Sequence, residues 1–465
     1  MRNRIHAAAA SGLTWTLLWM FLLASAWPPS SSAAQERAFT LIEAVRYALE
    51  HNNEIRAAGS SLAARKDDVG VARSNLLPKV YVEERALRTN NPTYAFMAKL
   101  NQGRFAQQDF AIDGLNNPNP VNDYQTLFAA EQPIFAPKAW VGLDMSKREH
   151  EAESVEFTRK KEEIAFKVCR AWLMVHTAKA QLAAAEKGVE DAQEHYRIAK
   201  LRYEADLGMV ADTLRAGTAA SEAKQRRVTA EKQLHLARRM LGLLLGLSGS
   251  AEVSGELPDF EIRDIEEYAK ASRARGDVRS MELRYENAEK SIRMAEMEYL
   301  PYVGVGGGYQ WNDPANLFGG SGDSWQVSAF LRWNLFDGTR REYERSKAKH
   351  QARQAHEHLE GMRKAAAYGL YQAQLGVEEA RANLELAREA LKTAEEGKRL
   401  VQIRYENAFS PIVDMLDAQV VLDRARAGLV ARENEYRVAV LNLGWESGTL
   451  LRDLGIEPDE KKDRP

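Results

Sequence analysis

The chain has 465 residues, a formal net charge of −2 at pH 7 and a pI near 6.6, so it lacks the basic excess of nucleic-acid-binding domains. Glycine (30) and proline (14) are few for this length, which favours long helices. The single cysteine, Cys169, cannot form a disulfide within the chain, and we expect it to be a small buried residue.

The first 34 residues have the pattern of a secretory signal peptide. Two arginines precede an apolar run over about 13–27, and small residues follow up to Ala34, where we predict cleavage. A retained N-terminal anchor is the alternative, although the apolar run is short for one. No cysteine stands at the expected mature N-terminus, so we expect no lipid modification there.

The rest of the sequence contains two copies of one repeat unit. The stretch "RYEADLGMVADTLRAG" (202–217) matches "RYENAFSPIVDMLDAQ" (404–419) in register, 202 positions later. Leu77-Pro78 corresponds to Leu300-Pro301 at an offset of 223, so the first copy holds about 22 extra residues between these landmarks. The predicted units are a first repeat over 35–250, a linker over 251–262, a second repeat over 263–450 and a polar C-terminal tail over 451–465.

Each copy predicts one very long helix and shorter helices around it. Apolar residues recur at alternating spacings of four and three from Ile164 to Tyr203 and from Ala366 to Tyr405, with a break only at Lys398. Heptads of this length are typical of left-handed coiled coils. By themselves they do not exclude an isolated coiled coil as the fold. The expected helices are 40–75, 138–206, 212–246, 264–298, 339–408 and 412–446.

Between the helices, four segments alternate like strands. Two of them, about 302–311 and 324–335, carry aromatic and aliphatic residues on one face, which suits a transmembrane barrel; a soluble hairpin on a core is the alternative. The expected lipid-facing residues are Trp325, Val327, Leu331, Trp333, Leu335, Tyr309 and Trp311. The first copy supplies a weaker pair, about 79–90 and 122–134, separated by a polar loop that we expect outside the cell without a packing role.

Four strands cannot close a barrel by themselves. Because lipid does not tolerate unpaired strand edges, the chain has to assemble with copies of itself. Two copies would supply eight strands and three would supply twelve, and the strand count does not decide between a dimer and a trimer. The predicted fold class is an α+β membrane protein with long antiparallel coiled-coil helices, four transmembrane β-strands per chain and an internal two-fold repeat.

The order of these features resembles the TolC family of outer-membrane efflux proteins. The resemblance rests on "FTLIEAVRYALEHNNEIRAA", the duplicated Leu-Pro, strand, strand, Phe blocks and the twin "RYE" phrases, and it covers about 37–450. It implies a homotrimer whose twelve-stranded β-barrel in the outer membrane continues into a periplasmic α-barrel. It also implies a passive exit duct of a tripartite efflux pump or type I secretion system, with a periplasmic adaptor and an inner-membrane pump as partners.

The resemblance further implies where the duct closes and docks. The twin phrases become two periplasmic turns, and aspartates of the second turn form a ring that narrows the opening. The expected gate residues are Asp414, Asp417, Tyr405 and Asp212. The expected adaptor-docking residues are Leu207, Gly208, Met209, Val210, Ala408, Phe409 and Pro411. The basic residue expected between Tyr405 and Asp414 is absent, which argues against a latch built on a salt bridge.

Two other functional classes fit the sequence less well. A periplasmic coiled-coil adaptor or scaffold without a membrane barrel is the alternative, but it leaves the alternation from Trp325 to Leu335 unexplained. An enzyme is disfavoured because the nine histidines form no HExxH motif and neither a Walker loop nor a nucleophile elbow is present. We therefore expect no catalytic residue, no metal site and no cofactor.

Overall fold

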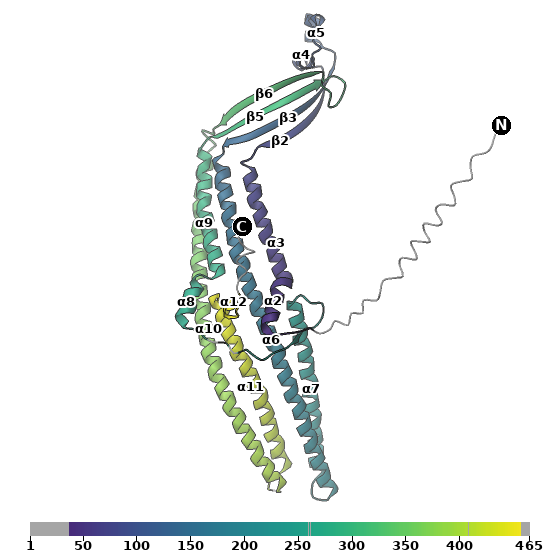
Figure 1. Cartoon of the computed structure of the whole chain (residues 1–465), viewed down its shortest axis with the longest axis vertical. Coiled ribbons are helices and arrows are strands. Elements are labelled where there is room, and N and C mark those ends of the chain that lie inside the picture. The colour runs from purple at the N-terminus through teal and green to yellow at the C-terminus, as the bar shows by residue number, and fades with distance from the viewer. Residues whose placement is uncertain (1–36, 259, 261, 408, 457–465) are drawn as a thin grey trace, which may run out of the picture.

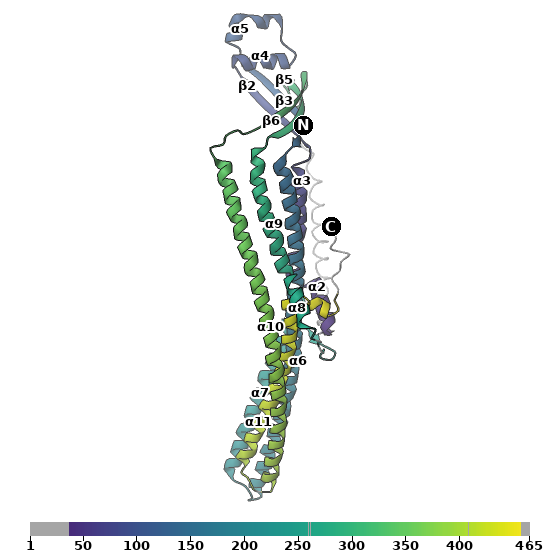
Figure 2. The same ribbon diagram turned by 90° about the vertical axis from the view of Figure 1, so that its left-hand side faces the viewer.

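The computed structural model describes residues 37–258, 260, 262–407 and 409–456 of the chain, which form one elongated molecule (Figure 1). A sheet lies at one end, and long helices run from it to paired helix ends at the other (Figures 1 and 2). The predicted signal peptide, 1–34, falls outside the described residues. None of the described helices combines the length and the apolar character needed to cross a membrane.

Each half of the chain contributes the same series of elements. The first half contains α2 (Leu41–His51), α3 (Asn53–Ser74), β2 (Lys79–Thr89), β3 (Val121–Phe135), α6 (Pro137–Glu204) and α7 (Val210–Leu244). The second half contains α8 (Ile265–Arg273), α9 (Gly276–Glu296), β5 (Tyr302–Asp313), β6 (Gly322–Arg332), α10 (Arg340–Glu406) and α11 (Ile412–Ser447). The two long helices have 68 and 67 residues, close to the bounds that the heptads predicted.

The shorter helices expected over 40–75 and 264–298 are each broken in two. Asn52 has an extended backbone, and its side-chain oxygen caps α3 by accepting hydrogen bonds from the N–H groups of Glu54 and Ile55. Its amide nitrogen also donates to the carbonyl oxygen of Leu244 at 2.7 Å. Arg275, which is buried, separates α8 from α9 in the second half. At Asn52, a side chain that competes for backbone groups thus ends a helix that apolar spacing alone would continue.

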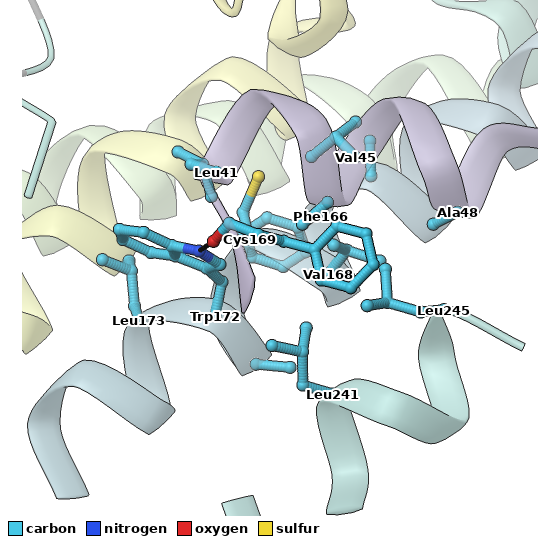
Figure 3. Packing of buried hydrophobic residues seen from close by; sticks show 14 of the residues in the cluster. Leu41, Val45, Ala48, Phe166, Val168, Cys169, Trp172, Leu173, Leu241 and Leu245 are labelled. Carbon is cyan, nitrogen blue, oxygen red and sulfur yellow. Dashed lines mark hydrogen bonds between the residues drawn. The ribbon is translucent and has the colours of Figure 1, made fainter. Parts of the chain in front are cut away.

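The main hydrophobic core lies near the middle of the molecule, where α2, α6 and α7 meet (Figure 3). Trp172 on α6 is fully buried, and its indole N–H donates to the carbonyl oxygen of Phe39 at 2.9 Å. Cys169 is buried as predicted, and burial raises the pKa of its thiol to about 12. A short parallel pair, β1 (Ala38–Phe39) with β4 (Glu252–Val253), borders this core, so part of the predicted linker is a strand.

The prediction of a polar tail from residue 451 onward is wrong for its first part. A short helix, α12 (Leu450–Asp453), follows a left-handed turn at Gly448. Leu451, Leu454 and Ile456 are buried in the main core. A segment this short has no helical stability of its own, so packing against the long helices orders it.

The sheet has the strand order β2-β3-β5-β6, and each neighbouring pair is antiparallel. Strands β2 and β6 are therefore its unpaired edges within the chain. Val80, Ala130, Gly307 and Val327 lie in one row across the four strands, so they share a face. On this face Val80, Trp325 and Val327 are 76%, 73% and 77% exposed, so the chain presents an apolar sheet face without covering it.

Trp333 and Leu335 lie beyond the strand that was expected to contain them. Strand β6 ends at Arg332, which pairs with Tyr302 at the start of β5, so no partner strand extends further. The indole N–H of Trp333 donates instead to the carbonyl oxygen of Tyr299 at 3.0 Å. Both side chains remain exposed, at 55% for Trp333 and 74% for Leu335.

The loop between β2 and β3 was expected to have no packing role, and this expectation is wrong. It contains α4 (Pro92–Asn101), a 3-10 turn (Gln107–Phe110) and α5 (Ile112–Asn116). Ala98 of α4 is buried against Val121 at the start of β3. Gln102 is 2% exposed, and its amide nitrogen donates to the Asn122 carbonyl oxygen and to Asp123, both at 2.8 Å. A buried amide with two partners anchors the loop to the outer end of the sheet.

Candidate functional site

The end of the molecule opposite the sheet consists of two helical hairpins, α6 with α7 and α10 with α11 (Figure 1). Tyr405 on α10 connects them, because it is 6% exposed and packs with residues of the other three helices. This tip core consists of Ala199, Ala216, Tyr405, Ile412 and Met415. The predicted gate residue Tyr405 is therefore a structural contact between the two hairpins.

A cation from the first hairpin covers Tyr405. The guanidinium carbon of Arg202 lies 4.6 Å from the centre of the Tyr405 ring, and Nη1 of Arg202 donates to the Tyr405 carbonyl oxygen at 3.4 Å. Such cation–π contacts contribute about 0.5–2 kcal/mol. A basic residue from α6 thus contacts Tyr405, although none stands between Tyr405 and Asp414 in the sequence. Arg202 stands in the repeated phrase itself, but only the packing of α6 against α10 reveals its partner.

Asp212, the expected partner of Tyr405, is placed differently. Its carboxylate lies 4.0 Å from Arg215, one turn further along α7. Within the part of the chain that the structure describes, no hydrogen bond joins Asp212 to Tyr405, whose contact with α6 is made by Arg202. As an acidic residue in the first turn of α7, Asp212 also interacts favourably with the helix dipole.

Asp414 and Asp417 lie three residues apart on α11, so they project from the same face of the helix. Both side chains are exposed. Neither carboxylate has an ion pair or a hydrogen bond to another described residue. Among the described residues, no cation therefore pairs with either charge.

The docking residues expected at the two turns form an exposed apolar surface. The exposed residues among them are Leu207, Met209, Val210, Phe409 and Pro411. Leu207 and Phe409 occupy equivalent positions in the two turns and are 78% and 77% exposed. Gly208 is half-buried, and Ala408 lies outside the described residues. Exposed apolar groups clustered among polar neighbours are typical of a protein-binding surface.

A buried polar cluster, which the sequence analysis missed, connects the hairpins between the tip and the main core. The amide nitrogen of Gln419 on α11 donates to Asp191 on α6 at 3.2 Å and to Asp423 at 2.9 Å. His195 is 6% exposed nearby; its burial and, to a smaller extent, the charge of Lys398 lower the pKa of its imidazole. Burial raises the pKa of Asp423. The break in the heptad at Lys398 was the sequence signal for this cluster.

The apolar face of the sheet is a continuous patch that includes most of the predicted lipid-facing residues. Tyr309 and Leu331 are 40% and 63% exposed on it, together with Trp325 and Val327. Trp311 is half-buried, because the ring of Phe128 packs edge-on against it at 5.1 Å. Large apolar side chains on an uncovered sheet face require either lipid or another protein surface.

Comparison with known proteins relates this architecture to membrane channels. Protein CyaE of Bordetella pertussis is 24% identical over 448 residues, which cover 95% of this chain and 90% of that protein. The CmeC outer membrane channel of Campylobacter jejuni has a TM-score of 0.75 at 15% identity, over 88% of this chain and 86% of that chain. The open state of the MtrE outer membrane channel of Neisseria gonorrhoeae has a TM-score of 0.73 at 16% identity, over 90% and 91%.

The family match follows the two halves of the fold. The outer membrane efflux protein family matches residues 44–247 and 268–444, which begin in α2 and α8 and end near the C-terminal ends of α7 and α11. The family consists of passive transport proteins rather than enzymes. The chain therefore belongs to the outer membrane efflux protein family, and it is an outer-membrane protein whose long helices lie in the periplasm.

Proposed function

We propose that the protein is a homotrimeric exit duct, in which three chains of four strands each form one twelve-stranded barrel. The observation that carries this proposal is the exposed apolar face of an open sheet. Its edge strands β2 and β6 have unpaired backbone groups, which are costly in lipid. Pairing β6 of one chain with β2 of the next satisfies both edges and closes the barrel.

The gate lies at the tip of the helices. Around a threefold axis, Asp414 and Asp417 of three chains bring six carboxylates together at the narrowest point. Carboxylates so close repel one another unless a cation lies among them. Tyr405, covered by Arg202, holds the two hairpins of each chain together in the closed arrangement, and Asp212 adds a charge at the first turn.

The two turns dock a periplasmic adaptor, which connects the duct to an inner-membrane pump. The exposed side chains of Leu207 and Phe409 supply the apolar contact. The duct passes its cargo without an energy source of its own, within a tripartite efflux pump or a type I secretion system. A periplasmic adaptor or scaffold without a barrel is disfavoured, because it gives no role to the exposed Trp325 and Val327.

Native mass spectrometry of the protein in lipid nanodiscs tests the assembly. We expect the mass of three mature chains, and a stable monomer in lipid would contradict the barrel. Val327→Lys should prevent assembly, because a charge on the lipid side of a strand costs about 2–4 kcal/mol at the bilayer midplane. Gln326→Lys, one residue away on the opposite face, is the matched control and should assemble normally. A trimer that passes no current in a planar bilayer would contradict the duct.

A further inference from the structure

A cavity of about 460 Å³ lies where the sheet meets the long helices, at the junction seen below the strands in Figure 1. Its wall is built from the periplasmic ends of the strands and the adjoining helix ends. The residues that carry the argument are Lys79, Glu131, Tyr302, Arg332 and Arg341. The gate and the docking surface, at the opposite end of the helices, contribute nothing to it.

The cavity opens on the sheet face opposite the apolar patch. Lys79 lies in one row with Glu131 and Ser328, immediately next to the row that contains Val80. Because successive residues of a strand point to opposite faces, the Lys79 row faces away from Val80. Arg332 is four residues after Ser328 on β6 and shares the face of Lys79. With the Val80 row toward lipid, the cavity faces the interior of the barrel.

The cavity has an excess of positive charge. Its wall contains five basic residues, Lys79, Lys138, Arg332, Arg340 and Arg341, and three acidic residues, Glu131, Glu298 and Asp337. Glu298 pairs with both Lys138 and Arg340, and Asp337 lies 3.3 Å from Arg341. Glu298 and Asp337 are thus engaged by three of the cations, and with Glu131 counted the wall keeps a net charge of +2 per chain.

Lys79 and Arg332 are the cations without a partner. Both side chains are exposed, and neither has an ion pair or a hydrogen bond to another residue in the described ranges. Glu131 lies across from Lys79 on β3 and accepts a hydrogen bond from the Tyr81 hydroxyl at 3.4 Å, and its negative charge is already included in the net charge of the wall. A guanidinium and an ammonium without an ion-pair partner attract carboxylates and phosphates, the guanidinium in a two-pronged geometry.

We propose that Lys79 and Arg332 form an anion-binding ring inside the barrel, which takes cargo that carries carboxylate or phosphate groups. This inference rests on the proposed trimeric duct, because a neighbouring copy completes the ring. Arg332 is the last residue of β6 and Lys79 is the first residue of β2, so they lie at the same end of the barrel. When β6 of one chain pairs with β2 of the next, Arg332 and Lys79 alternate around the circle as six cations.

Side chains of the neighbouring strands cover part of the wall beside the ring. On the interior face of β5, Gly304, Gly306 and Gly308 occupy successive positions, and the Phe330 ring lies over Gly304 while Leu127 lies over Gly308. At the other end of the duct, Asp414 and Asp417 carry the opposite charge. An anion that has passed the acidic tip therefore meets an attractive field before it reaches the outside.

The test is single-channel current in a planar bilayer with inorganic tripolyphosphate, and in a second arm citrate, added on the extracellular side. We expect the wild-type channel to be blocked by at least one of these anions. Lys79→Gln combined with Arg332→Gln should raise the half-blocking concentration about tenfold or more, because six charges are lost. Arg88→Gln is the control. Arg88 is an exposed cation on β2 that lies on the same face of the sheet as Val80, so this variant should leave the block unchanged.

Charge reversal gives an independent readout. Lys79→Glu combined with Arg332→Glu should abolish the anion block and shift the reversal potential in a salt gradient toward cation preference. A wild-type channel that neither anion blocks, or a double Gln variant with wild-type block, overturns the ring and leaves the duct in place. A wild-type trimer that passes no current overturns the duct and this inference with it.

Discussion

The two periplasmic turns have nearly the same sequence but different surroundings. Tyr203 and Tyr405 are equivalent residues 202 positions apart, yet Tyr203 is 45% exposed and Tyr405 is 6% exposed. Tyr405 is buried because it packs with residues of α6, α7 and α11, and Arg202 covers its ring. The same local sequence therefore ends both α6 and α10. The neighbours of each helix decide whether its tyrosine becomes a core residue.

Charge is the second difference between the turns. The residue equivalent to Asp417 in the second turn is Arg215 in the first. Arg215 lies 4.0 Å from Asp212, so the acidic residue of the first turn has a basic neighbour. Asp414 and Asp417 carry like charges that no described residue compensates. Duplication has thus produced a first turn whose acidic residue has a basic neighbour and a second turn whose two carboxylates have none among the described residues.

The largest expected effect separates the two tyrosines. Tyr405→Ala should lower the free energy of opening the tip by about 3 kcal/mol, because a buried aromatic ring leaves a cavity. Tyr203→Ala, on an exposed position, should change it by about 0.5 kcal/mol or less. Hydrogen exchange of the tip peptides, measured by mass spectrometry on the trimer, reports this difference. Equal protection in the two variants would show that the tip core does not hold the hairpins together.

The acidic residues of the second turn should matter more than that of the first. We expect the wild-type duct to be blocked from the periplasmic side by hexamminecobalt(III), a trivalent cation. Replacing both Asp414 and Asp417 with Ala should weaken this block about a hundredfold, because the six carboxylates of the trimer are removed. Asp212→Ala, the first-turn control, should weaken it only slightly. If the double variant keeps wild-type block, the two aspartates only stabilise the start of α11.

Docking should depend on both turns to a similar extent. Leu207→Asp or Phe409→Asp should each weaken binding of the cognate periplasmic adaptor about tenfold, as expected for an apolar contact residue. Val228→Asp is the control, because Val228 is 58% exposed on α7 but lies away from the turn. Binding is measured by biolayer interferometry on immobilised trimer. Unchanged binding of both turn variants would place the adaptor along the sides of the helices instead.

The smallest effect concerns pH at the buried polar cluster. Burial lowers the pKa of His195 in the folded chain, so the unfolded chain binds a proton first as the pH falls below about 6.5. Stability is therefore lost as the pH falls from that value toward the lowered pKa. The raised pKa of Asp423 acts in the opposite sense, because the folded chain binds this proton before the unfolded chain as the pH falls.

His195→Gln should accordingly flatten the pH dependence of the melting temperature between about pH 7.5 and 5.5. His235→Gln provides the control, since His235 is exposed on α7. This variant should keep the pH dependence of the melting temperature seen for the wild type. Differential scanning calorimetry of the trimer in detergent gives the melting temperatures. Parallel profiles for wild type and His195→Gln would mean that His195 does not titrate in this range.

The sequence by itself determined the elements that depend on local periodicity. A spacing of four and three sustained from Ile164 to Tyr203 and from Ala366 to Tyr405 requires long helices, and alternation from Trp325 to Leu331 marks a strand with one apolar face. The duplicated phrases located both turns. The exposure of Leu207 and Phe409 could also be expected from the sequence, because a loop that joins two antiparallel helices lies at a surface.

Tertiary structure alone decided which distant residues meet. Arg202 covers Tyr405, Gln419 donates to Asp191, and Leu454 enters the main core, although none of these contacts follows from spacing along the chain. The same holds for the cavity, which collects basic residues from strands and helices of both halves. Helix and strand periods place a side chain on a face, but the element opposite that face, and hence its charge and its burial, is set only when the whole chain packs.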